Sequence, residues 1–172
     1  MSKSRHDRVI KALYNICMSY KPYEKAKANA AHIEVSYKPI EIEGLARKGE
    51  TTKYRYDYYP DLWFELRKPR EDNRKIDVFE VWDTEPETER IQDIILASLV
   101  KGIWSFSIAC LSEWQRESAK RLSNIILSHL YNDEGKHLLN PKKSVFISLI
   151  TPELLSNEKM LKTQLQKDFK FI

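Results

Sequence analysis

The fold of this chain is decided by two apolar, aromatic-rich runs, Tyr59-Pro60-Asp61-Leu62-Trp63-Phe64-Glu65-Leu66 and Lys75-Ile76-Asp77-Val78-Phe79-Glu80-Val81-Trp82-Asp83. Each run is typical of a buried strand, yet each carries acids, and charged side chains are almost never fully buried unless they are paired or bind a metal. Two neighbouring strands that each place a carboxylate among large apolar residues indicate a shared site for a hard cation. Mg²⁺ suits such a site, because proteins bind it through one or two carboxylates together with phosphate oxygens of a substrate.

The pattern on either side of these runs predicts a mixed central β-sheet with helices on both faces. Apolar residues recur at helical spacing or alternate at strand spacing along the chain. An early set of strands followed by alternating helices and strands favours a mixed sheet. Pro60 places the first run at a sheet edge or at a bulge, because proline removes a ladder donor. We predict helices over 5–20, 84–101, 113–131 and 152–169, and strands over 32–43, 53–66, 75–82, 103–111 and 144–151.

Size and composition favour a single domain spanning residues 1–172, with a net charge of +4 that permits a nucleic-acid partner without requiring one. Cys17 and Cys110 lie far apart in the sequence, which is typical neither of a disulfide framework nor of a zinc site. The first residues have no apolar signal core behind them. The apolar stretch 94–111 is interrupted by Lys101 and Gly102, so we do not expect it to span a membrane. We therefore expect a cytoplasmic protein.

The two acids stand in a known arrangement. Pro60-Asp61 followed by Glu80-Val81-Trp82 resembles the PD-(D/E)xK phosphodiesterase superfamily, whose members have the restriction-endonuclease-like fold. The resemblance implies that Asp61 and Glu80 are metal ligands for Mg²⁺ (or Mn²⁺) in a nuclease that hydrolyses DNA. It also implies a homodimer, because two antiparallel strands of a duplex call for two sites.

The lysine of that motif is missing, since its position holds Trp82, which can neither carry charge nor activate water. Gln92 resembles the relocated glutamine of some nuclease lineages, and we expect it to orient the attacking water. Lys75 or Lys101 could supply the amine instead. Alternatively, the protein is a catalytically degenerate nucleic-acid-binding protein of the same fold. A third alternative is an interaction module that dimerises through the sheet edge.

Other acids near the motif have competing interpretations. Asp83 could add a ligand, and Asp7 could be either a further acid of resolvase-like members or a residue that caps the first helix. Asp61 could simply be a turn residue, because Pro-Asp is common in turns, and Glu80 could be a surface acid on an edge strand. We expect Asp77 to be solvated, because it has the opposite parity to Glu80, and Glu65 remains a second candidate.

Basic and aromatic residues near the motif suggest contacts with nucleic acid. The loop between the two runs is the densest basic segment and could contact phosphates, although a charged hairpin tip is usually just solvated. Its basic residues are Arg67, Lys68, Arg70, Arg74 and Lys75. The tyrosines from Tyr54 to Tyr59 could be a stacking platform for bases or an ordinary strand face. The four histidines are too far apart in the sequence for a zinc site.

Overall fold

The computed structural model describes residues 4–19, 32–45, 53–67, 75–83, 88–98, 103–129 and 144–171. The chain begins with helix α1 (Arg5–Met18), which buries Val9, Leu13 and Ile16 along one stripe, as the helical period predicts. The Ser4 hydroxyl caps this helix by accepting a hydrogen bond from the backbone N–H of Asp7 at 3.1 Å.

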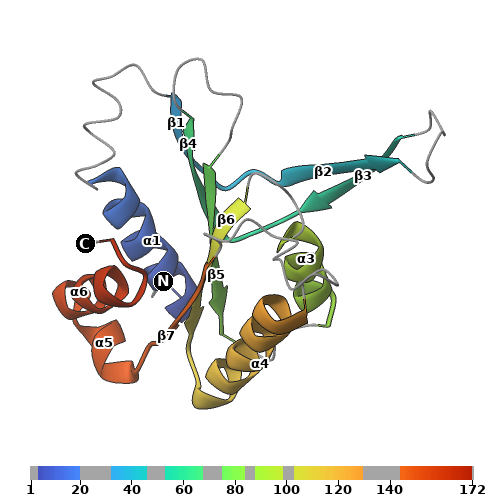
Figure 1. Ribbon diagram of the computed structural model, residues 1–172. Helices are drawn as coiled ribbons and strands as arrows, with labels where there is room; N and C mark the ends of the chain where they lie inside the picture. Colours follow the sequence, from blue (N-terminus) through green and yellow to red (C-terminus); the bar gives the residue numbers. More distant parts are fainter. Residues whose placement is uncertain are drawn as a thin grey trace.

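A five-stranded mixed sheet forms the centre of the molecule, as predicted (Figure 1). Its first half is antiparallel, because β4 (Leu62–Arg67) pairs antiparallel with both β1 (His32–Ser36) and β5 (Lys75–Trp82). Its second half is parallel, with β5, β6 (Ile103–Cys110) and β7 (Ser144–Leu149) side by side. The parallel strands carry nearly continuous apolar runs because helices cover both of their faces.

Helices lie on the two faces of the sheet (Figure 1). One face packs against α1, α5 (Pro152–Ser156) and α6 (Glu158–Asp168), and the other packs against α3 (Thr88–Ser98) and α4 (Glu113–His129). Successive side chains of β5 point to opposite faces of the sheet and so contribute to both cores. Phe79 and Val81 pack on the α1 side, whereas Val78 and Trp82 pack on the α3 side. The predicted start of α3 at Thr84 lies outside the described residues.

The structure corrects the predicted single strand over 53–66. Strand β3 (Lys53–Tyr58) ends before Pro60 and pairs with β2 (Ile40–Leu45) in a separate two-stranded sheet, which projects from the main body in Figure 1. The backbone leaves one sheet and enters the other across 59–61, where proline offers no ladder donor. The predicted extended segment 32–43 is likewise divided between β1 and β2.

The predicted C-terminal helix over 152–169 is two helices. Asn157 separates them in an extended conformation, and its side chain caps α6 by accepting from the backbone N–H of Met160 at 3.1 Å. Among the residues that the structure describes, no helix is long and apolar enough to cross a membrane.

Candidate functional site: a buried acid pair

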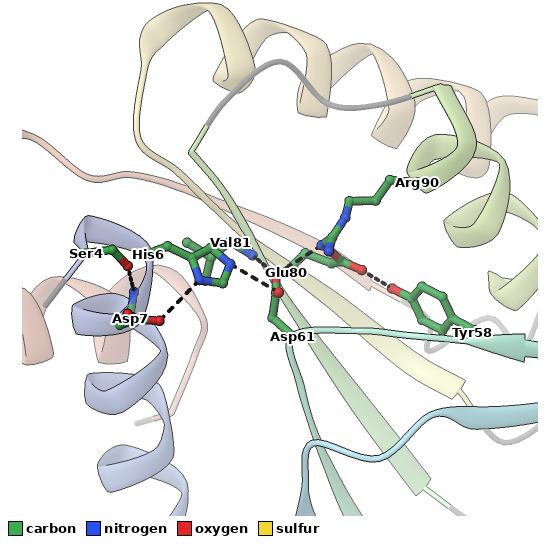
Figure 2. Close-up of polar contacts among 8 residues, drawn as sticks. All are labelled: Ser4, His6, Asp7, Tyr58, Asp61, Glu80, Val81 and Arg90. Carbon is green, nitrogen blue, oxygen red and sulfur yellow. Dashed lines mark hydrogen bonds and ion pairs between the residues drawn. The ribbon is translucent and has the colours of Figure 1, made fainter.

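Asp61 and Glu80 meet at one edge of the main sheet, although they come from different strands (Figure 2). Asp61 directly precedes β4, and Glu80 lies near the end of β5. The antiparallel register pairs Leu62 with Phe79, so the residue before Leu62 lies beside Glu80. This edge is also the carboxyl end of the parallel strands, which is where ligands bind in open α/β sheets.

The two carboxylates converge on one nitrogen of Arg90 (Figure 2). The Arg90 Nη1 group donates to Asp61 Oδ2 at 3.0 Å and also to Glu80 Oε2. Arg90 is the third residue of α3, and its side chain is 33% exposed. The structure thus brings the two acids of the motif to a single point and places one cationic group there.

Glu80 is fully buried and accepts a second hydrogen bond at its other oxygen, from the hydroxyl of Tyr58 at 2.5 Å. Burial raises the pKa of Glu80 to about 7, with help from the charge of Asp61 and against the effect of Arg90. Burial, together with the neighbouring Glu80, also raises the pKa of Tyr58 well above its usual range, which keeps its proton available for donation. Glu80 is therefore not the surface acid of an edge strand.

Asp61 is held by three groups from different elements. Its Oδ2 atom accepts from the backbone N–H of Val81 at 2.7 Å as well as from Arg90. Its Oδ1 atom lies 3.1 Å from Nε2 of His6, which belongs to α1. Since the side chain is only 10% exposed, Asp61 is more than a turn residue, because it ties the start of β4 to β5, α3 and α1.

The other proposed helpers lie elsewhere. Gln92 is exposed, and it follows Arg90 by two residues, which turns it about 200° round the helix. The structure therefore does not bring Gln92 to the acid pair. Asp83 forms an ion pair with Arg5 at 2.5 Å. Asp7 stands in the first turn of α1, where an acid favours the helix dipole, but the capping side chain is that of Ser4.

The two other acids within these strands, Asp77 and Glu65, do not join the acid pair. Asp77 is half-buried and accepts from the hydroxyl of Ser105 at 2.5 Å, so the prediction of a solvated charge is wrong. Glu65 is buried, but it pairs with Ile76, about 13 Å along the strand from Asp61 at 3.3 Å per residue. Trp82, at the lysine position, is buried in the core.

The basic loop lies largely outside the described residues: Arg67 ends β4, Lys75 begins β5, and 68–74 are not described, nor is Lys101. The tyrosines do not share one surface. Tyr58 is buried at the acid pair, whereas Tyr59 is 63% exposed, and Tyr56 is exposed and donates to Asp93 of α3.

Sequence reasoning missed three members of the site: Arg90, Tyr58 and His6. One signal was available for Arg90, because a cation in the first turn of a helix opposes the helix dipole and so calls for acidic partners. No local pattern pointed to Tyr58 or His6, which reach the acids only through the packing of β3 and α1.

Two carboxylates that share one position are the kind of donor set a small divalent cation would need, and in the structure Arg90 takes that position. Two hard carboxylate oxygens face the same point, and a positive group already lies against both of them. Mg²⁺ is typically bound through one or two protein carboxylates, with phosphate and water oxygens completing its shell. The described residues contain no group of three or more His, Cys, Asp or Glu side chains that could hold a metal.

Comparison with protein-family models, with curated proteins and with solved structures found no match for this chain.

Proposed function

We propose that the protein is a metal-dependent nuclease that hydrolyses DNA phosphodiester bonds on a restriction-endonuclease-like fold. The observation that carries the proposal is the convergence of Asp61 and Glu80, from adjacent antiparallel strands, on one cationic position. Their placement supports the resemblance, in which an acid at the start of one strand and an acid within the next hold the metal. Their position at the carboxyl edge of the parallel strands is where ligands bind in open α/β sheets, and the parts of the cluster that reach solvent there are Arg90, 33% exposed, and Asp61, 10% exposed.

Asp61 and Glu80 would hold Mg²⁺ or Mn²⁺, which supplies polarisation of the scissile phosphate and a lowered pKa for water. The residues around the acids keep them in place: Tyr58 and the backbone N–H of Val81 each hold one carboxylate oxygen. Arg90 would move from between the acids to a phosphate oxygen, which a guanidinium binds in a bidentate manner. Arg90 keeps its proton, since the neighbouring acids raise its pKa, so it stabilises charge and cannot act as a base.

The same arginine favours a second candidate, a catalytically degenerate nucleic-acid-binding protein of this fold. With Trp82 at the lysine position, Arg90 would then serve as a permanent replacement for the metal. Binding of the phosphate backbone would fall to the basic loop residues Arg67, Lys68, Arg70, Arg74 and Lys75.

A cleavage experiment separates the two candidates. Plasmid and single-stranded DNA are incubated with the protein in Mg²⁺, Mn²⁺ or EDTA, and the substitutions Glu80→Gln and Asp61→Asn are compared with Glu113→Gln, an exposed acid on α4. A nuclease should cleave only with metal, should lose about 100-fold or more activity in the two site variants, and should keep it in the control. DNA binding without cleavage in any metal would establish the degenerate binder.

A binding measurement adds a readout besides activity. Mn²⁺ titrated into the wild-type protein by calorimetry should show one site per chain that is lost in Glu80→Gln. No uptake of Mn²⁺, with or without DNA, would exclude the metal-dependent mechanism.

A further inference from the structure

Arg90 takes the position that the two acids share. Its Nη1 group donates to Oδ2 of Asp61 at 3.0 Å and to Oε2 of Glu80. The other two carboxylate oxygens have partners of their own, since Oε1 of Glu80 accepts from Tyr58 and Oδ1 of Asp61 lies 3.1 Å from His6 (Figure 2). A divalent cation held by both acids would need the two oxygens that Arg90 contacts. The cation and the guanidinium therefore exclude each other at this position.

The acids are fixed in place, whereas Arg90 is the member of the cluster that has room to move. Glu80 is fully buried, and the hydroxyl of Tyr58 and the backbone N–H of Val81 hold the two acids from the strands. Arg90 extends from the first turn of α3, and its side chain is partly exposed. An arginine keeps its proton in a protein, so it leaves the acids as a cation and needs an anion at its new position.

We propose that Arg90 couples metal binding to DNA binding by moving between the acid pair and a backbone phosphate of the DNA. A metal ion binds the acids only when Arg90 is away from them, and a phosphate binds Arg90 only in that same arrangement. Each ligand therefore selects the state that the other needs, so each binds more tightly when the other is present. This inference rests on the proposed function for both ligands and adds how metal binding is restricted to the DNA complex.

The charges of the cluster favour the exchange when DNA is present. Without an anion, a divalent ion on the acids and the displaced guanidinium would lie close together and repel each other. A phosphate forms charge-assisted hydrogen bonds with the guanidinium and offsets this repulsion. The free protein therefore keeps Arg90 between Asp61 and Glu80, as the structure shows.

Mn²⁺ binding without DNA tests the exclusion. Unbound Mn²⁺ is counted from its EPR signal in titrations of the wild-type protein, Arg90→Gln and Arg55→Gln, a control that removes the same charge from an exposed arginine of β3. Arg90→Gln should bind Mn²⁺ at least about tenfold more tightly than the wild type, and the control should match the wild type. Adding Glu80→Gln to Arg90→Gln should abolish the gain. Near-UV circular dichroism checks that each variant is folded.

DNA binding by the wild-type protein measures the coupling itself, so this measurement does not depend on the folding of a variant. A fluorescent duplex is titrated with protein in EDTA and in Ca²⁺ at equal ionic strength, with Ca²⁺ chosen as a poorer Lewis acid that limits cleavage. Ca²⁺ should tighten DNA binding at least about fivefold, the lower end of common coupling factors. Arg90→Gln should lose most of this factor, because its acids are open to metal with or without DNA.

Equal Mn²⁺ affinity in the wild type and Arg90→Gln, or equal DNA affinity of the wild type in Ca²⁺ and EDTA, would overturn the coupling. Metal-dependent cleavage would then still support the nuclease. Both expected gains in a protein that never cleaves DNA would uphold the coupling and reject the nuclease. Absence of Mn²⁺ binding in every variant, with and without DNA, would overturn both.

Discussion

Glu80 is a carboxylate in the interior of the sheet whose environment is made almost entirely of two partners. Arg90 approaches one oxygen and Tyr58 the other, and no part of the side chain reaches solvent. A buried ion pair is weak evidence of stabilisation, because the desolvation of both charges offsets much of their attraction. Net stabilisation therefore does not by itself account for a charged pair in an apolar strand, which is consistent with the proposed function.

The pKa of Glu80 predicts how stability depends on pH. In the folded protein the pKa of Glu80 is about 7, whereas an ordinary glutamate has a pKa of 4.5, so the folded protein binds more protons than the unfolded chain between these pH values. The free energy of unfolding should therefore fall as pH rises from about 4.5 to about 7, by about 3 kcal/mol from this group.

Urea unfolding of the wild-type protein and Glu80→Gln, measured in EDTA across this pH range, isolates the contribution. The free energy of unfolding of the wild type minus that of Glu80→Gln should fall as pH rises from about 4.5 to about 7. The curve for Glu113→Gln should run parallel to that of the wild type. Parallel curves for Glu80→Gln would show that Glu80 is ionised throughout.

Arg90→Ala should destabilise the protein and make it responsive to metal. The substitution leaves two carboxylates without their common cation, and since Arg90 is partly exposed we expect a loss of about 2–4 kcal/mol, somewhat below the range for fully buried pairs. A divalent ion at the same position should restore about 2.7 kcal/mol at 100 times its dissociation constant.

Thermal unfolding with and without Mn²⁺ measures both effects. Arg55→Ala is the matched control, because Arg55 forms exposed ion pairs with Glu41 and Asp57, whose loss should cost less than about 1 kcal/mol. Stabilisation of both variants by Mn²⁺ to the same extent would indicate metal binding elsewhere.

At the scale of elements, the break between β3 and β4 is what completes the acid pair. The chain leaves the small sheet across 59–61, so Tyr58, the last residue of β3, is buried against Glu80, and Asp61 directly precedes β4. The short connection between β3 and β4 thus has a side chain of the site at each end, Tyr58 and Asp61.

Tyr58→Phe should test this link. The substitution removes the donor to a buried carboxylate oxygen, which costs about 1–3 kcal/mol, or roughly 2–12 °C in the unfolding midpoint for a chain of this length. The hydrogen bond from Tyr58 lowers the pKa of Glu80, so its loss should raise that pKa. The pH at which stability stops falling should then also be higher. Tyr59→Phe, at the adjacent exposed residue, should change neither quantity, and an equal effect of both substitutions would reject the link.

At the scale of the whole molecule, the mixed sheet gathers one edge of functional groups between two layers of helices. Helix α1 reaches this edge with His6 from one face, and α3 reaches it with Arg90 from the other (Figure 2). Each carboxylate therefore depends on the packing of the complete three-layer structure.

The oligomeric state belongs to this scale. By the resemblance we predict a homodimer with an isologous interface, because members of that superfamily that cleave a duplex need one acid pair for each strand. Sedimentation velocity at tens of micromolar should give a species of twice the 20.4 kDa chain mass. A monomer at every concentration, with and without DNA, would contradict the prediction.

Much of the architecture was predictable because its signals are local. The alternation in β5 and the helical periods of α1, α3 and α4 can be read from a few neighbouring residues, and the structure confirms a mixed sheet with helices on both faces. The splits at Pro60 and Asn157 were missed, because in each case the apolar pattern continues across a residue that changes the direction of the backbone.

For the site, the sequence by itself determined which acids are candidates. Asp61 and Glu80 are charged residues among apolar ones, and this contrast is visible from a few neighbouring residues. Only the tertiary structure decided what faces them. Arg90, Tyr58 and His6 lie 10, 22 and 55 residues from the acids they contact, and strand pairing and helix packing alone bring them together. Their identity carries no local signature because their energetic role exists only where burial removes water from the two carboxylates.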